Sequence, residues 1–402
     1  MIPFSPPHIG ESTLSLIKET LESGWITTGP KTKLLEQKVA AYCGSKTTYC
    51  VNSATAGLEL VLRWFGVGPG DEVILPAYTY CATANVVEHC GATPVLVDID
   101  PKTFNISVSE VEKAINSRTK VIMPVDFAGF PCDYNALNSL VKRAEVKSQF
   151  SAATEIQEKL GRILILSDAA HSFGGKLGGK LCGSLTDISV FSFHAVKNFT
   201  TAEGGAIAFN LPEEFNPQEV YQYFNTFALH GQNKDALAKT QKGNWRYDVL
   251  MPGYKCNMTD LLACIGLAQI DHYESEDLAK RKEIFSYYTQ SLVGCSWAEI
   301  PTFKEQERES SYHLYPLRLK GVSEETRDRI IQSIFDKDVA VNVHFIPLPM
   351  LSYYKKAFDI IDFPVAYDSY SREISLPVYY NLTPDQQSKV IQAVIDSVEE
   401  NI

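Results

Sequence analysis

The sequence predicts an α/β fold, in which a mostly parallel sheet is covered by helices on both faces and followed by a smaller α+β domain. Short apolar runs alternate with helix-like patterns over residues 11–209 of the 402-residue chain, and each run is apolar along its whole length. Such runs are typical of parallel strands buried on both faces. From about residue 260 the pattern turns helical, and it then changes to a mixture of short strands and helices.

The spacing of apolar residues predicts the individual elements. We expect helices at 11–22, 32–43, 56–65, 108–116 and 133–145, and strands at 73–75, 94–97, 121–125, 163–166, 188–193 and 206–209. A helical stretch over 260–293 leads to segments 312–319 and 339–345 and to helices at 323–336 and 383–399. We therefore divide the chain into a large domain, 1–270, and a small domain, 271–402. The glycine-rich segment 174–183 lacks the spacing of a phosphate loop and predicts a hairpin turn.

One lysine stands in the loop between two of these strands. The run 188–193 is β-branched and aromatic, Lys197 follows it, and a Gly-Gly pair precedes the run 206–209. Desolvation in such a loop lowers the pKa of an amine and lets it attack a carbonyl carbon. From the residues alone, the alternative is an ordinary loop lysine whose ammonium group reaches solvent.

An aspartate follows the apolar run 163–166. Asp168 would lie at the carboxyl end of a core strand, where α/β folds place their ligands. A buried carboxylate needs a cationic partner. Pyridoxal phosphate (PLP) enzymes supply one, because they pair an Asp with the pyridinium nitrogen and a Lys with the aldehyde. The alternative for Asp168 is a helix N-cap.

Two further segments carry binding chemistry. In 52–60 a hydroxyl-rich turn opens an apolar-periodic helix, and such a helix start binds anions. In 75–85, Tyr80 is placed to stack on a heteroaromatic ring. The alternatives are a plain N-cap at Ser53 or Thr55 and a core or interface tyrosine at position 80.

Composition excludes several classes of protein. The net charge is −11 with a pI near 5.3 and no basic stripe, which argues against nucleic acid as a partner. The nine cysteines are scattered without CxxC or other ligand spacing, so we expect reduced thiols and no metal. The first residues lack the features of a signal peptide, and no apolar run is long enough to span a membrane. We expect a cytoplasmic protein.

Together these segments resemble the DegT/DnrJ/EryC1/StrS family of sugar-nucleotide aminotransferases, which are fold-type I PLP enzymes. The matching text is SGWITTGPKT (23–32), NSATAGLEL (52–60), GDEVILPAYTYCATAN (70–85), GATPVLVDID (91–100), SDAAHSFGG (167–175), FSFHAVKNFTTAEGG (191–205), PGYKCNMTD (252–260) and HFIPL (344–348). The resemblance covers most of the chain, and the block 191–205 is its most specific part. It implies the fold-type I PLP-dependent transferase fold, with a seven-stranded sheet in the large, PLP-binding domain.

The resemblance also implies roles for single residues. Lys197 matches the lysine that binds PLP covalently, and Asp168 matches the partner of the pyridinium nitrogen. His171 matches a residue beside the phenolic oxygen of PLP. Tyr80 matches the aromatic residue stacked on the ring. The implied contacts to the cofactor phosphate are Thr55, Ala56, Ser192 and, from the neighbouring subunit, Asn257.

A shared phosphate site implies a homodimer whose subunits complete each other's active sites. Trp25, Thr28 and His344 match regions that line the entrance for the sugar nucleotide. The implied reaction transfers an amino group from glutamate to a 4-keto sugar linked to UDP or dTDP, in cell-surface polysaccharide or lipopolysaccharide biosynthesis. The pattern is most similar to the branch that aminates a UDP-linked 4-keto pentose, as in 4-amino-4-deoxyarabinose formation, or UDP-linked 4-keto-6-deoxyhexoses.

Two segments depart from the family pattern. Asp126 stands where relatives often have His, and it either alters contacts near the substrate or caps a turn. The polar connection 147–160 is longer than usual and predicts a surface extension.

Competing interpretations come from other classes of protein. A sugar 3-dehydratase of the same scaffold carries His in place of the lysine, so Lys197 argues against it. A non-catalytic PLP-binding or sugar-nucleotide-binding regulator has little need of both Lys197 and Asp168. A C3-keto-sugar aminotransferase remains an alternative, and the lack of a GxGxxG after any strand argues against a Rossmann-like dehydrogenase.

Overall fold

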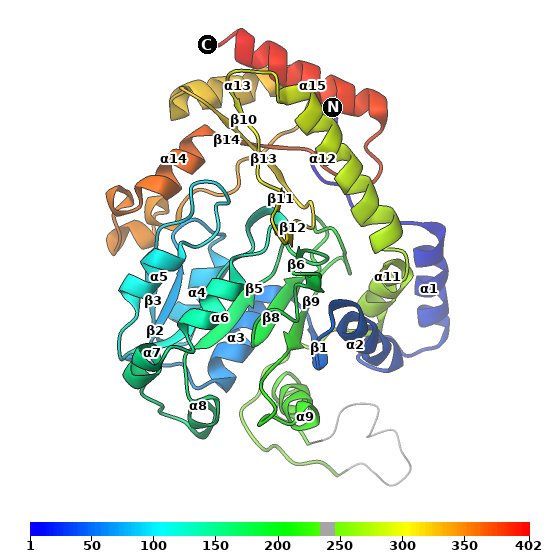
Figure 1. Ribbon diagram of the computed structural model, residues 1–402. Helices are drawn as coiled ribbons and strands as arrows, with labels where there is room; N and C mark the ends of the chain where they lie inside the picture. Colours follow the sequence, from blue (N-terminus) through cyan, green and yellow to red (C-terminus); the bar gives the residue numbers. More distant parts are fainter. Residues whose placement is uncertain (234–245) are drawn as a thin grey trace.

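The computed structural model describes residues 1–233 and 246–402, and a seven-stranded sheet forms its centre (Figure 1). The strand order is β1-β9-β8-β5-β4-β2-β3. The strands are β1 (Thr47–Val51), β2 (Glu72–Pro76), β3 (Thr93–Val97), β4 (Thr119–Ile122), β5 (Leu164–Asp168), β8 (Ile188–Ser192) and β9 (Gly205–Phe209). Only β9 runs against its neighbours, β8 and β1, while the other pairings are parallel. The predicted α/β fold with a mostly parallel seven-stranded sheet is confirmed.

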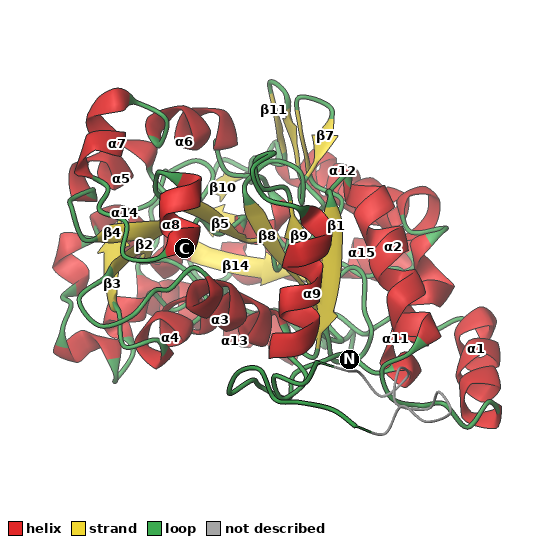
Figure 2. Ribbon diagram, turned by 90° about the horizontal axis from the view of Figure 1, so that it is seen from below, coloured by secondary structure: helices red, strands yellow, loops and turns green. Residues whose placement is uncertain are grey.

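Helices cover both faces of this sheet (Figure 2). One face packs on α3 (Ala54–Trp64), α4 (Ala82–His89) and α9 (Pro217–Phe227). The other packs on α5 (Val108–Ala114) and α6 (Tyr134–Leu140), and on α2 (Pro30–Cys43) and α11 (Asp260–Ile270). Alternate strand residues serve the two faces: Val73 and Leu75 lie in the first core, and Ile74 lies in the second. The continuous apolar runs of the sequence are explained by this double burial.

The C-terminal part contains a small antiparallel sheet, β10-β13-β14, with helices beside it. Its elements are β10 (Ala298–Glu299), β13 (Tyr315–Leu319), β14 (Glu373–Leu376), α12 (Ala279–Leu292), α13 (Glu324–Asp336), α14 (Pro364–Arg372) and α15 (Pro384–Glu399). The apolar cluster of α2 and α11 continues into α12, β13 and α15. The domain boundary at residue 270 stays a prediction.

Shorter elements complete the fold. They are α1 (Glu11–Glu22), α7 (Ala144–Gln149), α8 (Glu155–Leu160), β6 (Lys176–Leu177), β7 (Lys180–Leu181), β11 (Lys304–Glu305), β12 (Arg308–Glu309) and the single turns η1 (Phe127–Gly129), η2 (Glu274–Leu278), η3 (Leu348–Met350), η4 (Tyr354–Lys356) and η5 (Ile360–Asp362). The hairpin predicted in 174–183 is confirmed as β6–β7. Gly178 and Gly179 form its turn with φ values of 57° and 77°, which favour glycine at both positions.

Several sequence predictions are wrong. Segment 339–345 is not a strand: it makes only isolated bridges, Ile2 to Val339 and Asn342 to Ser375. The Asn342 side chain accepts a hydrogen bond from the Val343 N–H, which then cannot join a ladder. The helix predicted at 133–145 is divided into α6 and α7, because Arg143 adopts an extended conformation. Strands β1 and β14 and helix α4 were not predicted.

The polar connection 147–160 is more than a surface extension. It contains all of α8, whose residue Gln157 is fully buried. The Gln157 amide donates to the Phe65 carbonyl at 2.9 Å, and its oxygen accepts the Ala153 N–H at 2.9 Å. The connection is therefore attached to the end of α3 by a buried side chain.

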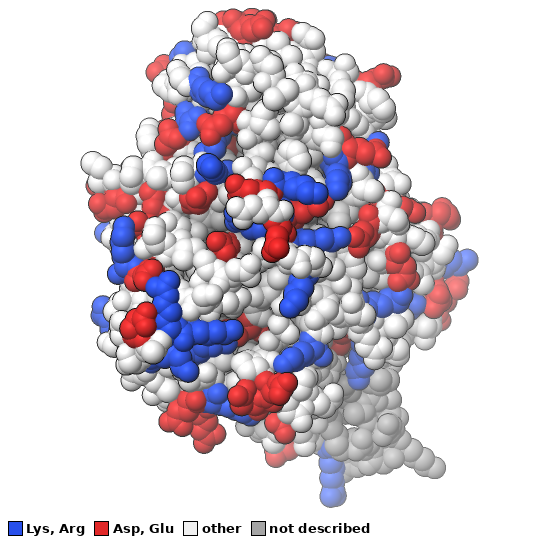
Figure 3. All heavy atoms as spheres, in the orientation of Figure 1, with Lys and Arg blue, Asp and Glu red and all other residues white. Residues whose placement is uncertain are grey.

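The structure also bears on the expected environment. Among the described residues, no helix combines the length and the apolar character that a membrane crossing requires. All nine cysteines are unpaired in the structure, and their reduced state stays a prediction. Acidic and basic side chains lie next to each other on the face shown in Figure 3. The cytoplasmic location stays a prediction.

Replacing Gln157 tests the role of the connection. Gln157→Ala should lower the free energy of unfolding by about 1 to 3 kcal/mol, because the Phe65 carbonyl and the Ala153 N–H lose their partner. Gln149→Ala, the same change at an exposed position of α7, should have little effect. Denaturant unfolding measures both. Equal stability of the two variants would contradict a stabilising role of the buried Gln157 hydrogen bonds.

Candidate active site

A cavity of about 390 Å³ lies at the carboxyl ends of β5 and β8. Asp168 is the last residue of β5, Ser192 is the last residue of β8, and Lys197 follows in the loop that leads to β9. The start of α3 contributes Thr55, and the segment before α4 contributes Tyr80. The predicted residues that line this cavity are Thr55, Tyr80, Asp168, His171, Ser192, Lys197 and His344. The topology thus collects residues that are far apart in the sequence.

Lys197 is half-buried, and its surroundings favour the uncharged amine. Burial lowers the pKa of Lys197 to about 8, and the Asp168 carboxylate partly opposes this shift. A pKa of about 8 leaves about a tenth of the amines uncharged at pH 7, against fewer than about one in a thousand at the ordinary value. The structure therefore favours a partly desolvated amine over an ordinary loop lysine with a solvated ammonium group.

Asp168 is buried and held by two hydrogen bonds. Its Oδ2 accepts from Thr83 Oγ1 at 2.8 Å, and its Oδ1 accepts from the Ala170 N–H at 3.3 Å. Burial raises the pKa of Asp168, while the Thr83 hydroxyl, the Ala170 N–H and the Lys197 charge oppose this rise. No helix begins after Asp168, so the N-cap alternative is wrong.

The wall of the cavity has one polar atom without a partner. His171 is buried, and its Nδ1 has no hydrogen bond among the described residues. Its ring lies 4.4 Å from that of His313 and 5.8 Å from that of Phe345, and burial holds the pKa of His171 well below its ordinary value. A buried neutral imidazole requires a polar partner. A ligand oxygen in the cavity would supply it, so this wall fits the phenolic side of PLP.

The start of α3 combines a helix cap with a residue of the cavity wall, whereas Tyr80 is exposed at the cavity. Ser53 is a plain N-cap of α3, since its hydroxyl accepts the Ala56 N–H at 3.1 Å. Ala56 itself does not line the cavity, whereas the neighbouring Thr55 does. Tyr80 is 60% exposed at the cavity, with its ring 5.8 Å from that of Phe345. Tyr80 is therefore free to lie against a planar ligand and is not a core residue.

Three predicted residues lie outside the cavity and contact one another. The Trp25 indole N–H donates to the Thr28 carbonyl at 3.2 Å, and the Asn257 amide donates to the Thr28 hydroxyl. None of the three lines the cavity of its own chain. We call Trp25, Thr28 and Asn257 the outer cluster.

Asp126 has a structural role in this chain. Its fully buried carboxylate accepts hydrogen bonds from Ser172 Oγ at 2.6 Å, from Tyr134 Oη at 2.6 Å and from the Cys132 N–H at 2.9 Å. It does not line the cavity. The structure therefore favours the interpretation that Asp126 caps a turn.

Several residues of the cavity were not predicted from the sequence. His313 and Phe345 line it, and Phe4 and Ser5 reach it from the N-terminus. The His313 Nδ1 lies 2.8 Å from the Asn198 Oδ1, which orients the imidazole. No local pattern marks His313, because only the packing of the segment before β13 against the Lys197 loop brings it to the site.

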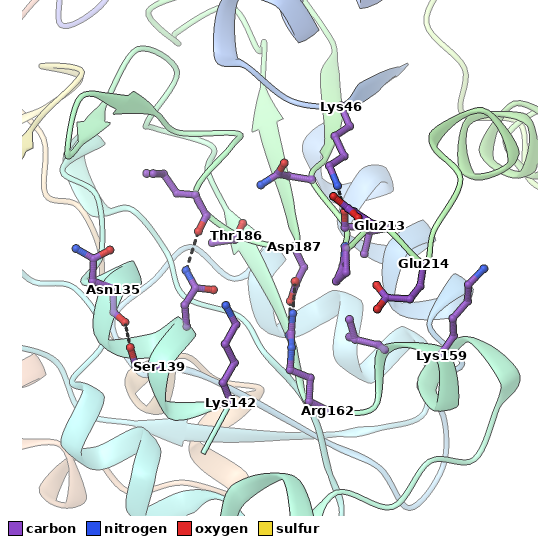
Figure 4. A pocket seen from close by; sticks show the side chains of 16 residues that line it. Lys46, Asn135, Ser139, Lys142, Lys159, Arg162, Thr186, Asp187, Glu213 and Glu214 are labelled. Carbon is purple, nitrogen blue, oxygen red and sulfur yellow. Dashed lines mark hydrogen bonds and ion pairs between the residues drawn. The ribbon is translucent and has the colours of Figure 1, made fainter. Parts of the chain in front are cut away.

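A second, more open hollow of about 950 Å³ lies at the other ends of the same strands (Figure 4). Several of its charged groups have partners: Arg162 pairs with Asp187 at 2.7 Å, and Lys46 donates to the Leu211 carbonyl at 2.6 Å. The Lys159 ammonium lies 4.9 Å from the centre of the Phe215 ring. This hollow contains neither Lys197 nor Asp168, so we assign the chemistry to the smaller cavity. Among the described residues, no group of three or more His, Cys, Asp or Glu is arranged to hold a metal ion.

Comparison with known proteins identifies the family. Residues 7–395 match the model of the DegT/DnrJ/EryC1/StrS aminotransferase family. The chain belongs to this family. The spore coat polysaccharide biosynthesis protein SpsC of Bacillus subtilis is 36% identical, over 99% of this chain and 97% of that protein.

Solved structures agree with this membership. Spr1654 of Streptococcus pneumoniae, named as a sugar aminotransferase, superposes in its PMP-form with a TM-score of 0.96 and 46% identity, covering 100% of both chains. Its PLP-form gives a TM-score of 0.95. PseC of Helicobacter pylori, an aminotransferase involved in pseudoaminic acid biosynthesis, gives 0.87 with 27% identity over 99% of both chains. The predicted family and the predicted class of enzyme, an aminotransferase, are confirmed.

The lowered pKa of Lys197 can be tested in cofactor-free protein. Acylation of Lys197 by an amine-reactive reagent, followed by peptide mass spectrometry, should rise with pH and reach half its maximum near pH 8. Asp168→Asn should move this midpoint to lower pH, because the carboxylate raises the pKa of the amine. Lys18, exposed on α1, serves as the internal reference. The same midpoint in both proteins would contradict the coupling of the two groups.

Proposed function

We propose that this protein is a PLP-dependent aminotransferase that moves the amino group of glutamate to the 4-keto group of a nucleotide-linked sugar. The observation that carries the proposal is that Lys197 and Asp168 line the same cavity and shift each other's pKa. The cofactor is PLP, in keeping with the family and with the PLP-form of Spr1654. When bound, PLP supplies an electrophilic carbon and a ring that withdraws electrons.

The residues of the chain have separate tasks in this reaction. Lys197 would hold the cofactor aldehyde in the resting enzyme. Its Nζ is uncharged in an appreciable fraction of molecules near neutral pH, so it can take a proton from the α-carbon of the amino donor. In the second half of the reaction, the same amine would return a proton to the carbon that receives the amino group. Asp168 would keep the proton on the ring nitrogen, because an anion beside this nitrogen favours the protonated form. His171 would donate or accept at the phenolic oxygen, and Tyr80 would cover the ring.

The cofactor phosphate would lie at the start of α3. An α-helix of 11 residues presents free N–H groups and the positive end of its dipole there. Thr55 and Ser192, which both carry hydroxyls, line the same cavity. Ala56, whose N–H is bonded to Ser53, is the least suited of the predicted phosphate contacts.

The substrate assignment is supported by the family and by the names of the relatives. SpsC is named for polysaccharide biosynthesis and PseC for pseudoaminic acid biosynthesis. We therefore place the acceptor among UDP- or dTDP-linked keto sugars used for cell-surface polysaccharide or lipopolysaccharide. His344, which lines the cavity, would contact this substrate.

The outer cluster supports a homodimer. Trp25, Thr28 and Asn257 were matched to the sugar-nucleotide entrance and to a phosphate contact, yet they lie outside the cavity of their own chain. In a homodimer with shared sites, these residues would serve the cavity of the partner subunit.

Removing the lysine tests the enzyme class. Lys197→Ala should lower turnover by about a thousandfold or more, because both the covalent attachment and the proton carrier are lost. It should also remove the visible absorbance of lysine-bound PLP, which adding glutamate should bleach in the wild type. A variant with near-normal turnover would disprove the assignment.

Neutralising the aspartate tests the role of the ring proton. Asp168→Asn should lower kcat by about a hundredfold to a thousandfold, or about 3 to 4 kcal/mol, because an unprotonated ring is a weaker electron sink. Single-turnover rates with glutamate measure the loss. The control is Asp133→Asn, since Asp133 caps the remote α6. Equal rates for wild type and Asp168→Asn would contradict this role.

A complementation assay tests the shared site. Co-expressed Lys197→Ala and Asn257→Ala chains should form hybrid dimers with one site that carries neither change, so activity should exceed that of either variant alone. Light scattering reports the assembly. An active monomer, or hybrids no more active than their parents, would contradict the shared site.

Rates with a panel of 4-keto and 3-keto sugar nucleotides, each with glutamate, test the substrate. We expect the 4-keto substrates to react fastest. Faster turnover of a 3-keto sugar would favour a C3-keto-sugar aminotransferase, and the absence of both cofactor absorbance and turnover would favour a non-catalytic binder.

A further inference from the structure

Behind the cavity, a buried carboxyl group is linked to a cavity imidazole through one hydroxyl. The Nδ1 of His344 lies 2.9 Å from Ser375 Oγ, and Ser375 Oγ lies 2.5 Å from Oε1 of Glu373. The other oxygen of Glu373, Oε2, accepts the backbone N–H of His344 at 2.9 Å. Glu373 therefore controls both the backbone and the ring of a residue that lines the cavity.

The carboxyl group of this chain of contacts has no access to solvent. Glu373 and Ser375 on β14 are both fully buried. The His344 ring lies along the cavity wall, and its Nε2 has no hydrogen bond to any residue that the structure describes. Since Nδ1 is occupied by Ser375, Nε2 is the nitrogen left for a ligand.

Resting on the proposed function, we propose that Glu373 is a positioning residue that acts through Ser375 to decide whether His344 Nε2 donates or accepts a hydrogen bond in the cavity. An ionised carboxylate only accepts, so Ser375 must donate to it and take the Nδ1–H of His344, which leaves Nε2 as an acceptor. A protonated Glu373 donates to Ser375, Ser375 donates to Nδ1, and the imidazole proton then lies on Nε2. When one state changes into the other, one proton shifts along each hydrogen bond between Glu373, Ser375 and His344. The imidazole of His344 is neutral in both states.

The charges around the two ends suit such a switch. Burial raises the pKa of Glu373 to about 8, against the influence of its hydrogen bonds and of two arginines, so the change of state falls within the working range of an enzyme. Burial lowers the pKa of His344 to about 3, with help from the Lys197 charge, so the imidazole stays neutral in both states. The groups facing Glu373 are Arg327 of α13, Arg318 of β13 and Tyr78, and those facing His344 are Lys197, His171 and His313.

The protonation state of Glu373 would decide whether a ligand meets a hydrogen-bond donor or an acceptor at His344. Below about pH 8 the cavity would present an N–H donor, which suits the carboxylate, phosphate or carbonyl oxygen of a substrate. Above it, the cavity would present an acceptor, which suits a hydroxyl or an ammonium group.

Nitrogen NMR of protein labelled in its histidines tests this directly, because the imidazole shifts show which ring nitrogen carries the proton. In the wild-type holoenzyme, the proton of His344 should move from Nε2 to Nδ1 as the pH rises through about 8. In Glu373→Gln the amide imitates the protonated acid, so His344 should keep its proton on Nε2 at every pH. In Ser375→Ala the link is cut, and the pH dependence should vanish.

Glu36→Gln is the matched control. Glu36 is also a buried carboxyl group with a pKa raised by burial, to about 7, but it lies on α2 away from the cavity. This variant should reproduce the wild-type movement of the His344 proton. Lys197→Gln removes the main cavity cation and separates its titration from that of Glu373.

A kinetic measurement gives the functional outcome. The KM for the keto-sugar substrate should change about tenfold between pH 7 and pH 9 in the wild type and stay constant in Glu373→Gln, as expected for one hydrogen bond gained or lost. A pH-independent tautomer in the wild type, or the same proton movement in Glu373→Gln, would overturn the proposal. Because the NMR readout needs no turnover, failure of the proposed function would not be mistaken for failure of this switch.

Discussion

The burial of one amine and one carboxylate against a single cavity is the constraint on which the site depends. Burial favours the neutral forms of Lys197 and Asp168, and each group partly restores the charge of the other. When Lys197 is uncharged, Asp168 loses its counter-charge and retains only the Thr83 hydroxyl and the Ala170 N–H. A protonated ring nitrogen would replace the missing cation. The pair is therefore suited to a ligand that binds the amine covalently and carries a positive charge elsewhere.

The sheet topology brings these groups together. The parallel strands β5 and β8 end at the same edge, where Asp168 is paired with Val190, two residues before Ser192. The antiparallel β9 then returns the chain, so that the loop with Lys197 lies over this edge. Gly205 permits the close approach of α3: a Cβ there would come within 2.7 Å of both the Ala54 nitrogen and the Phe191 carbonyl oxygen. The helix start that would bind a phosphate is thereby held next to the lysine loop.

Local patterns predicted the central part of the fold because its strands are buried on both faces. Runs such as 163–166 and 206–209 carry enough apolar character to be recognised without their neighbours. Strand β14 was missed because it contains Glu373 and Ser375, which are buried only through tertiary hydrogen bonds. Segment 339–345 was mistaken for a strand because apolar residues alternate there. The Asn342 side chain accepts the Val343 N–H, which is then not available to a neighbouring strand.

The site residues that could be predicted are those whose side-chain chemistry and position in the sequence both indicate a binding site. Lys197 and Asp168 stand at or just after strand ends within distinctive local sequences, Tyr80 was singled out as a stacking residue, and the resemblance to the family added His171. His313 could not be predicted, because it reaches the cavity only through the docking of the segment before β13. The outer cluster lies apart from the cavity of its own chain, and its proposed role at a partner's site rests on the resemblance to the family.

Peptide mapping of PLP-loaded protein after borohydride reduction tests the central claim most directly. Reduction fixes a cofactor bound through its aldehyde to the amine that holds it. We expect one modified peptide, which contains Lys197, and its loss in Lys197→Ala. Cofactor fixed mainly on another lysine, or no fixed cofactor in a protein that remains fully active, would contradict it.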